Sequence, residues 1–310
     1  MAKRRPHKPS GPRRGTAAPH VSAADMPEYL RRIGVSPRKA LGQHFLIDEF
    51  ILADIADACA FQPGETAFEI GAGPGGLTEE LARRADRVVA VELDEELAAL
   101  TRERLAAYPH LTVLAADVLD FAPIELLEEA GAAPPYVAVG NLPYYITQPV
   151  VRRLLESDPP PDRIIVMVQR EVGRRMVGGE GRESLLSMSV KFYGEPRWLL
   201  DVPSTAFWPT PKVQSAPVAI DRRPAPAVAL DAHEQRVFFE LLRAGFASPR
   251  KQLHNSLPGA LGLAHAVVTD AITAAGLDPV LRAQHLALDD WERLFRVLRE
   301  RFPEAFDVAE

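Results

Sequence analysis

The segment Phe68-Glu69-Ile70-Gly71-Ala72-Gly73-Pro74-Gly75-Gly76-Leu77-Thr78 joins the end of an apolar strand, a glycine-rich turn and the start of a helix. Glycine lets the backbone approach a ligand closely and adopt positive φ angles. Gly71, Gly73 and Gly76 also satisfy the G-x-G-x-x-G spacing of dinucleotide-binding turns, although such a motif alone is weakly specific. The segment therefore predicts a ligand site at the carboxyl end of a strand.

From Thr66 onward, strands alternate with helices along the chain. Such alternation predicts a doubly wound parallel sheet. The predicted strands are 66–70, 87–92, 111–115, 135–140 and 163–168, and the predicted helices are 76–84, 94–106, 123–130, 149–156 and 170–177. Two further predicted strands, 197–202 and 216–220, can form a hairpin at the sheet edge.

The two ends of the chain differ from this central region. Residues 1–26 are rich in Lys, Arg, Pro, Gly, Ala and Ser, which predicts a disordered basic arm. After a Pro-rich linker at 222–226 the strand signal stops, and the predicted helices are 231–246, 249–257, 265–275 and 289–301. We therefore expect an α/β, Rossmann-like domain at 27–222 and a small all-α domain at 223–310.

Composition limits the class of protein. No apolar run approaches the roughly 20 residues of a membrane helix, so we expect no membrane span. The single Cys59 excludes an internal disulfide framework and a cysteine-rich metal site, and it favours the reducing cytosol. The net charge is −6, but the first 25 residues carry six cations and one acid, which leaves about −11 on the remainder. Any RNA site on the remainder must therefore be a local basic patch.

Polar residues follow three successive predicted strands. Glu92 can accept both ribose hydroxyls of a nucleoside, in a nicotinamide cofactor or in S-adenosylmethionine, and Asp117 can accept the adenine amine. Taken singly, these acids are more often helix caps or solvated turn residues. Acid, acid and Asn141 after successive strands is, however, the arrangement of an S-adenosylmethionine site. That cofactor has no pyrophosphate, so the glycine turn would pack on its methionine part, with Glu69 as an organiser.

The fourth strand runs directly into Asn141-Leu142-Pro143-Tyr144. Pro143 cannot continue a strand ladder and stiffens the turn. An amide oxygen, a backbone carbonyl and an aromatic face in one rigid loop can hold a planar molecule with an exocyclic amine, such as a nucleobase. The alternative is an ordinary strand-to-helix turn in which Asn141 is a turn residue and Tyr144 is packing.

Together these motifs resemble the small-subunit ribosomal RNA adenine dimethyltransferase family, the KsgA-type enzymes, over residues 38 to 300. The segments that carry the resemblance are Gly42-Gln43-His44-Phe45-Leu46, the Glu69 glycine turn, Val91-Glu92-Leu93-Asp94, Asp117, Asn141-Leu142-Pro143-Tyr144, Val168-Gln169-Arg170-Glu171-Val172, Phe207-Trp208-Pro209-Thr210-Pro211-Lys212-Val213, Arg250-Lys251-Gln252-Leu253-His254-Asn255-Ser256-Leu257 and Leu281-Arg282-Ala283-Gln284. One departure is Glu183-Ser184, where many relatives have Tyr-Gly.

The resemblance implies the cofactor S-adenosyl-L-methionine and a set of residues that contact it. In this family pattern Gly71 lies against the methionine part, Glu92 holds the ribose and Asp117 contacts the adenine. Asn141 closes the cofactor site and also meets the substrate. The complete predicted cofactor set is His44, Leu46, Glu69, Gly71, Gly73, Glu92, Asp117 and Asn141.

The resemblance also implies how the methyl group is transferred to adenine N6. Hydrogen bonds from the amine to the Asn141 side chain and the Leu142 carbonyl would aim its lone pair at the methyl group. Tyr144 would stack on the flipped base, and Phe207 would pack against it from the other loop. The alternative for Phe207 is a hydrophobic plug beneath a Pro-rich loop. The predicted catalytic set is Asn141, Leu142, Pro143, Tyr144 and Phe207, without a metal or a strong general base.

The expected substrate is a pair of adjacent adenines in a stem-loop near the 3′ end of small-subunit rRNA. We expect a cytoplasmic monomer that acts on this rRNA within a pre-30S particle. Candidate phosphate contacts are Arg222, Arg223, Arg250 and Lys251, although Arg250 and Lys251 can equally be a solvated helix face. Three other functions compete: a large-subunit rRNA methyltransferase of the antibiotic-resistance type, a non-catalytic assembly factor and a nicotinamide dehydrogenase.

Overall fold

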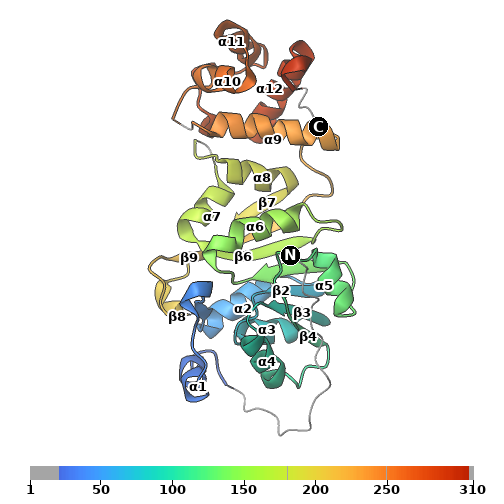
Figure 1. Ribbon diagram of the computed structural model, residues 1–310, viewed down its shortest axis with the longest axis vertical. Coiled ribbons are helices and arrows are strands. Elements are labelled where there is room, and N and C mark those ends of the chain that lie inside the picture. The colour runs from blue at the N-terminus through green and yellow to red at the C-terminus, as the bar shows by residue number, and fades with distance from the viewer. Residues whose placement is uncertain (1–20, 180, 249, 307–310) are drawn as a thin grey trace. The chain divides into compact units, whose positions relative to one another are not determined.

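The computed structural model describes residues 21–179, 181–248 and 250–306 (Figure 1). The predicted basic arm at 1–26 therefore lies outside the described residues as far as residue 20. From residue 21 the chain already packs on the protein: the Val21 carbonyl accepts a hydrogen bond from Arg104 at 3.2 Å, and Met26 is buried. Helix α1 begins at this buried methionine and spans Met26–Arg32.

Tertiary contacts divide the chain into two compact units, Met1–Gly173 with Arg197–Arg222, and Arg174–Pro196 with Arg223–Glu310. The junction at 222 coincides with the predicted domain boundary. Residues 174–196, however, group with the C-terminal helices rather than with the predicted 27–222 domain. The reason lies in their packing, because Phe192 contacts Phe238 with ring centroids 6.0 Å apart.

The first unit is built on a seven-stranded sheet with the order β4-β3-β2-β5-β6-β9-β7. Strands β4 to β6 run parallel along this order, and β9 is antiparallel to β6. The strands are β2 (Thr66–Ile70), β3 (Arg87–Glu92), β4 (Leu111–Ala115), β5 (Tyr136–Gly140), β6 (Arg163–Gln169), β7 (Gly194–Trp198) and β9 (Ser215–Arg222). The predicted α/β fold is thereby confirmed, and the predicted edge pair is β7 and β9, with β7 beginning three residues earlier than expected.

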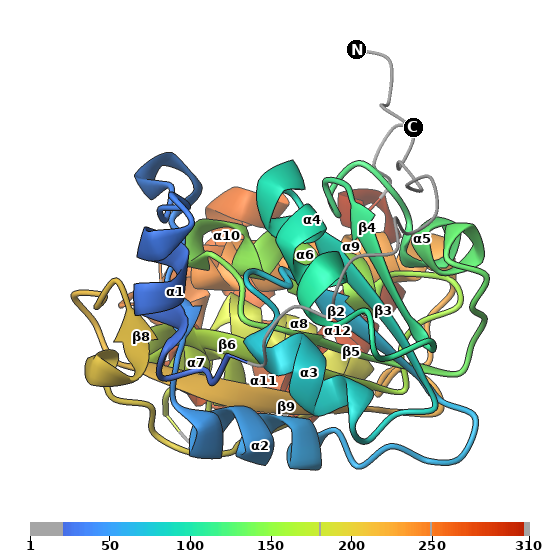
Figure 2. The same cartoon turned by 90° about the horizontal axis from the view of Figure 1, so that it is seen from below.

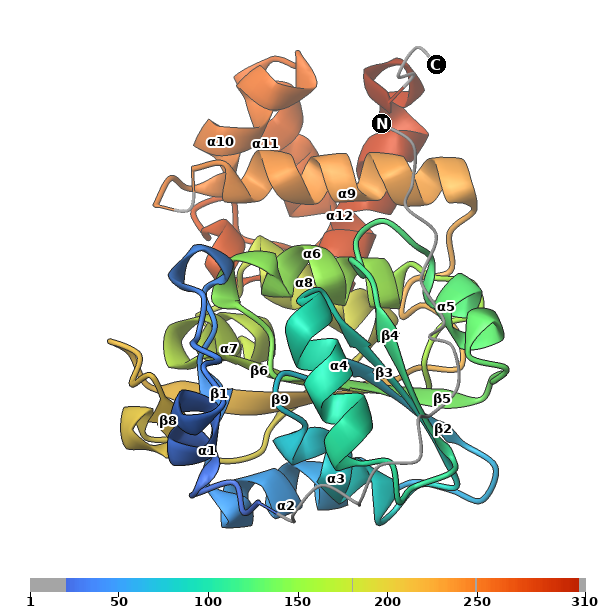
Figure 3. The same ribbon diagram turned by 60° about the horizontal axis from the view of Figure 1, so that its bottom comes forward.

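The central strands are apolar on both sides because helices cover both faces of the sheet. Every residue of β2 and β5 is buried, which is typical of a parallel sheet. Val88 packs with α2 and α3, and Ala90, on the same face, packs with Ala98 of α4. Figures 1 and 3 show α6 on the opposite face. These helices are α2 (Glu49–Ala58), α3 (Gly76–Ala82), α4 (Glu95–Arg104), α5 (Pro123–Glu129) and α6 (Tyr144–Leu155).

The side chain of Asp48 caps the start of α2. It accepts hydrogen bonds from the backbone N–H groups of Phe50 and Ile51, both at 3.1 Å. Phe50 is 84% exposed. It lies about 200° around the helix from Leu52, which is buried.

A second, two-stranded sheet joins the amino-terminal loop to the Pro-rich loop. Strand β1 (Phe45–Leu46) pairs antiparallel with β8 (Phe207–Trp208), with Leu46 opposite Phe207. The short helices η1 (Lys39–Leu41) and η2 (Ser204–Ala206) precede these strands. Figures 2 and 3 show α1 beside β8, and the Arg31 guanidinium lies 5.7 Å from the centre of the Trp208 ring.

The second unit is helical. Its core contains Trp291, Phe238 and Phe295, all fully buried. Helix α8, whose apolar and polar residues alternate from Leu186 to Phe192 as in a strand, was not predicted. The helices are α8 (Leu185–Tyr193), α9 (Ala232–Phe246), α10 (Leu253–Leu261), α11 (His265–Ala274), η3 (Ala283–His285), α12 (Leu288–Arg301) and η4 (Pro303–Phe306), while α7 (Arg170–Val177) crosses the boundary between the units.

Within the described ranges, no single helix is long and apolar enough to cross a membrane. By length and composition alone, α10 and α11 taken together would be long and apolar enough for a span. The two helices are bent by 118° relative to each other.

Candidate active site

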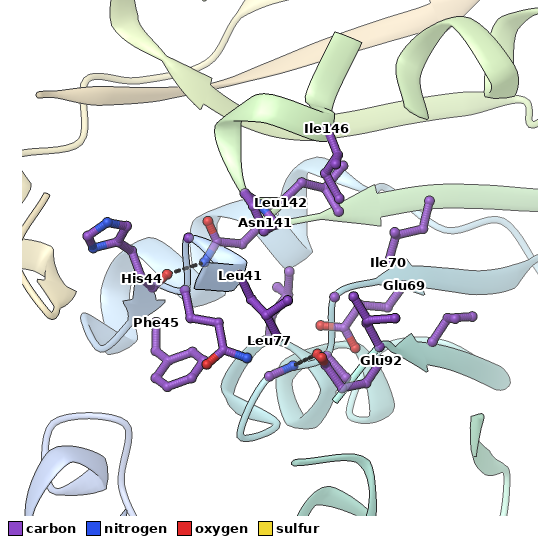
Figure 4. A pocket seen from close by; sticks show the side chains of 18 of the residues that line it. Leu41, His44, Phe45, Glu69, Ile70, Leu77, Glu92, Asn141, Leu142 and Ile146 are labelled. Carbon is purple, nitrogen blue, oxygen red and sulfur yellow. Dashed lines mark hydrogen bonds between the residues drawn. The ribbon is translucent and has the colours of Figure 1, made fainter. Parts of the chain in front are cut away.

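A pocket lies at the carboxyl ends of β2, β3, β4 and β5, where a parallel sheet is expected to bind its ligand. The amino-terminal loop at 41–46 forms its remaining wall (Figure 4). Of the predicted cofactor and catalytic residues, all except Phe207 line this pocket: His44, Leu46, Glu69, Gly71, Gly73, Glu92, Asp117, Asn141, Leu142, Pro143 and Tyr144.

The glycine turn brings bare backbone to the pocket wall. Gly71 has φ +80° and Gly73 has φ +54°, conformations that other residues rarely adopt. The Thr101 hydroxyl donates to the Gly73 carbonyl at 2.8 Å, and Gly71 donates its N–H to the Val91 carbonyl at 2.8 Å. The turn is thus fixed from α4 and from β3.

Glu92 is the most firmly held acid of the pocket. Its Oε2 accepts the Gly73 N–H at 2.7 Å (Figure 4), and its Oε1 accepts the Asp94 N–H at 2.9 Å. Burial raises the pKa of Glu92, and these backbone hydrogen bonds oppose the rise. Each carboxylate oxygen has a further acceptor site, so Glu92 can accept two hydroxyl groups in a fixed orientation.

Glu69 places a buried carboxyl group at the pocket. It is 1% exposed, and neither carboxyl oxygen has a hydrogen bond of good geometry within the described ranges. Burial raises its pKa to about 8; the nearby Thr78 hydroxyl lowers this pKa, and the Glu92 charge raises it further. Such a group is suited to a ligand that brings a cation or hydrogen-bond donors.

Asp117 lies at the end of the pocket formed by the turn after β4. Its Oδ1 accepts the Leu119 N–H at 2.9 Å, which is an ordinary turn contact. Ala116 and Val118 flank it in the pocket wall, and Leu93, 48% exposed, also lines the pocket. A carboxylate between apolar side chains can recognise the edge of a flat heterocycle. Leu93 was not among the predicted site residues, although it directly follows Glu92 in the sequence.

Asn141 is held in one orientation. Its Nδ2 donates to the His44 carbonyl at 3.2 Å (Figure 4). Because a carbonyl only accepts, the amide nitrogen must face His44, and Oδ1 is turned away from that carbonyl. Leu142 is buried, and α6 begins at Tyr144, five residues earlier than predicted, so the Asn141 loop leads directly into a helix.

Tyr144 is fixed through both its hydroxyl and its ring. The hydroxyl shares a hydrogen bond of 2.6 Å with Ser215 at the start of β9. The ring is stacked with that of His44, with centroids 6.5 Å apart. His44 Nδ1 in turn donates to the Pro209 carbonyl at 2.5 Å. Burial raises the pKa of the Tyr144 hydroxyl, so it stays neutral at physiological pH.

Phe207 does not reach the pocket. Its side chain is 2% exposed and belongs to the core cluster that contains Leu46 and Val202. The prediction that it faces the target base is therefore not met in this structure, because strand pairing with Leu46 directs the ring inward. The arrangement agrees with the alternative of a hydrophobic plug behind the pocket wall.

The four residues that are candidates for phosphate binding differ in their exposure and in the partners that they already have. In the first unit, Arg222 donates to the Leu155 carbonyl at 3.1 Å. In the second unit, Arg223 is ion-paired with Glu195 at 3.1 Å, whereas Arg250 and Lys251 are exposed. The latter two are the better placed to bind phosphate.

The departure at Glu183-Ser184 has a structural role inside the second unit. Glu183 binds the Lys191 ammonium and the Ser187 hydroxyl, both at 2.6 Å. The Ser184 hydroxyl accepts the Ser187 N–H at 3.1 Å and caps α8. These two residues therefore stabilise the start of a helix that the sequence did not reveal.

The strand order, the glycine turn after β2 and the acids after β3 and β4 together define a Rossmann-like methyltransferase. Residues 34–300 match the family model described as ribosomal RNA adenine dimethylase. The chain belongs to this family of S-adenosylmethionine-dependent rRNA adenine dimethyltransferases, which confirms the predicted family, fold and class of enzyme.

Curated relatives cover nearly the whole chain. It is 40% identical over 291 residues to ribosomal RNA small subunit methyltransferase A of Dehalococcoides mccartyi, an alignment that spans 93% of this chain and 97% of the relative. The protein of the same name from Moorella thermoacetica is 39% identical, with 87% and 95% of the two chains covered. That from Bacillus pumilus is 38% identical, with 88% and 95% covered.

Solved structures support the same fold. The structure of 23S rRNA methyltransferase ErmE superposes with a TM-score of 0.67 at 30% identity, covering 82% of this chain and 99% of that one. A dimethyladenosine transferase from Plasmodium falciparum superposes with a TM-score of 0.70, covering 82% and 97%; at 22% identity it shows the fold alone.

Proposed function

We propose that this enzyme transfers methyl groups from S-adenosylmethionine to N6 of two adjacent adenines in a stem-loop near the 3′ end of small-subunit (16S) rRNA. The observation that carries the proposal is that Asn141 and Leu142 line the same pocket as Glu69, Glu92 and Asp117. A donor site and an amine-binding loop thus share one cavity. The names of the curated relatives support the choice of small-subunit rRNA.

The residues of the pocket fit the donor. Glu69, a buried carboxyl that lacks a hydrogen-bond partner of good geometry within the described ranges, suits the ammonium of the methionine part. Gly71 and Gly73 leave room for that part, Glu92 is fixed to accept the ribose hydroxyls, and Asp117 can accept the adenine amine. When bound, S-adenosylmethionine supplies a methyl group activated by its sulfonium charge.

The Asn141 loop performs the recognition of the target base. Asn141 Oδ1 and the Leu142 carbonyl accept hydrogen bonds from the N6 amine, which favours a pyramidal nitrogen with its lone pair directed at the donor. Tyr144 stacks on the base, and Pro143 keeps the loop rigid. Alignment in a site that excludes water supplies the rate enhancement, and the released proton passes to solvent. For dimethylation, the pocket must also admit N6-methyladenine.

We further propose that the protein acts as a cytoplasmic monomer on rRNA within a pre-30S particle. Arg250 and Lys251 would contact phosphates, with a smaller part for Arg222 and Arg223 because their guanidinium groups already bind protein partners. A phosphate contact of this kind positions the RNA without reading its sequence.

A second candidate is methylation of large-subunit rRNA, favoured by the likeness to ErmE at 30% identity over 82% of the chain. The higher identity of 38% to 40% to the three small-subunit relatives argues against it. Leu142 and the Arg-Lys-x-Leu-x-Asn-x-Leu pattern at 250–257 also resemble the small-subunit enzymes.

The test is methyl transfer from radiolabelled S-adenosylmethionine to unmethylated small subunits and, in parallel, to large subunits, followed by mapping of the modified bases. The proposal expects label on two neighbouring adenines of small-subunit rRNA only. Label confined to the large subunit would establish the second candidate. No transfer to either particle, with S-adenosylmethionine still bound in calorimetry, would indicate a non-catalytic assembly factor.

A further inference from the structure

The segment 38–46, here called the strap, contributes one wall of the pocket. It is held by polar contacts at both of its ends. At the first end, Arg38 Nε lies 3.1 Å from Asp94 Oδ2, and Arg38 donates its backbone N–H to Gln43 Oε1 at 2.7 Å. Asp94 is buried and follows directly on Glu92 and Leu93. Arg38 thereby holds the strap against the turn that follows Glu92, the acid proposed to bind the ribose.

At its second end the strap meets the catalytic loop. The His44 carbonyl accepts the Asn141 Nδ2 hydrogen bond at 3.2 Å, and the His44 ring donates to the Pro209 carbonyl. Phe45 and Leu46 continue as β1, paired with β8. Between the two ends, Leu41, Gly42 and Gln43 line the pocket. One short segment thus contacts both the donor site and Asn141.

The His44 carbonyl decides which atom Asn141 offers to the substrate. The terminal torsion of Asn is broad and nearly two-fold, so its oxygen and nitrogen can exchange places at small cost unless a neighbour distinguishes them. A reversed amide would direct its NH2 group at the adenine amine, and two donors would face each other. The position of His44, and therefore of the strap, bears directly on methyl transfer.

We propose that Arg38 is a positioning residue for methyl transfer, which acts by holding the strap so that His44 fixes the Asn141 amide in its accepting orientation. The inference rests on the proposed function, because the accepting orientation matters only if an amine is the substrate. Arg38 is itself half exposed, with a side-chain exposure of 52%, and it pairs with the buried Asp94 and, at 3.3 Å, with Glu96. Without Arg38, Asp94 still accepts the Glu96 N–H. Thermal unfolding of each variant separates a kinetic effect from a loss of stability.

The experiment compares Arg38→Gln, Arg38→Lys and the control Arg152→Gln with the wild type. Arg152 also has an exposed ion pair, with Glu156 at 3.0 Å on α6, but it touches neither the strap nor the pocket. Asp94 is not changed, because its other oxygen caps α4 by accepting the Glu96 N–H. Each protein is assayed for thermal unfolding, for calorimetric binding of S-adenosylmethionine and for steady-state methyl transfer to unmethylated small subunits.

The proposal expects Arg38→Gln to lower kcat about tenfold at saturating S-adenosylmethionine, in an enzyme that remains folded at the assay temperature. Arg38→Lys should restore most of this kcat, and Arg152→Gln should match the wild type. An Arg38→Gln enzyme with wild-type kcat would overturn the proposal, even if its KM for the donor rises, because the strap would then serve donor binding alone. A wild-type enzyme that binds the donor but modifies neither adenine would instead refute the proposed function.

Discussion

The Glu92 carboxylate and the Gly73 amide are joined by a hydrogen bond of 2.7 Å, and the other Glu92 oxygen accepts the Asp94 N–H at 2.9 Å. One side chain therefore binds the glycine turn after β2 to the turn after β3. The same carboxylate lines the pocket, so its position determines both the shape and the chemistry of the proposed donor site.

Replacement of Glu92 by Gln should weaken the binding of S-adenosylmethionine, although the two side chains have nearly the same shape. An amide has a single oxygen, so its NH2 group would face one of the two backbone donors. In the proposed complex the ribose hydroxyls donate to the Glu92 carboxylate, and hydrogen bonds to a charged group contribute about 1.5–3 kcal/mol each, which predicts a loss of affinity of about 10- to 100-fold for S-adenosylmethionine. Calorimetry measures this loss, with Glu103→Gln on the exposed side of α4 as control. Equal affinities for the two variants would contradict the role of Glu92.

Glu69 should make folding stability depend on pH. Its pKa is raised from 4.5 to about 8, so in this window the folded chain keeps a proton that the unfolded chain has released. The contribution of Glu69 to stability therefore falls as pH rises, by at most ~1.4 kcal/mol per pH unit, and levels off above pH 8. Glu69→Gln lacks this loss, so its stability relative to the wild type should increase between pH 5 and 8.

Urea unfolding of both proteins at pH 5, 6.5 and 8 tests this expectation, since other titrating groups cancel in the comparison. Parallel stability curves would show that the Glu69 carboxyl ionises normally. At pH 8 the same Gln variant should bind S-adenosylmethionine more weakly, because it cannot supply a charge to the ammonium group.

Asn141→Ala should abolish methyl transfer while leaving RNA affinity nearly intact. The substitution removes the acceptor for the N6 amine, and loss of one such group in an active site costs about 100- to 1,000-fold in kcat. Asn141→Asp should not restore activity, because a carboxylate oxygen would then face the His44 carbonyl. Radiolabel transfer and filter binding of the same rRNA fragment separate the two quantities. Full activity in Asn141→Ala would refute the assignment.

The sequence predicted the sheet well because its signals are local. The strands that flank the glycine turn are short apolar runs between turn residues, and their observed bounds differ from the predicted ones by one residue at most. Helix α6 begins five residues earlier than predicted, and Pro149, the first residue of the predicted helix, lies inside it. Helix α8 was missed because apolar and polar residues alternate from Leu186 to Phe192, a pattern typical of a strand rather than a helix.

Several pocket residues were predicted for a related reason, since Gly71, Glu92 and Asn141 lie at or directly after the ends of strands that the sequence marks. Phe207 was misplaced because its direction depends on pairing with Leu46, a partner far away in the chain. The contact of His44 with Asn141 is also between distant residues and uses a backbone carbonyl, which no side-chain pattern reveals. Local patterns thus identified residues that line the pocket, but not the contacts that orient them.

Gly140 offers a test of the packing beneath the site. A Cβ at this residue would lie 2.6 Å from the Ile70 carbonyl of β2, so Gly140→Ala must separate two central strands and should cost about 1–3 kcal/mol. Gly259 on α10 has open space around its Cα, and Gly259→Ala should be neutral or stabilising by up to about 1 kcal/mol. Thermal unfolding of the two variants provides the comparison. A stable Gly140→Ala protein would show that β2 and β5 can move apart without cost.

The two-stranded sheet of β1 and β8 has a consequence for biosynthesis. His44 and Pro209, which its strands bring together, are 165 residues apart in the chain. This wall of the donor pocket can therefore form only after the ribosome has made the polypeptide beyond residue 209. A nascent chain would carry the acids and the glycine turn well before it could close this wall of the pocket. The enzyme would therefore become able to bind its methyl donor only late in its own translation.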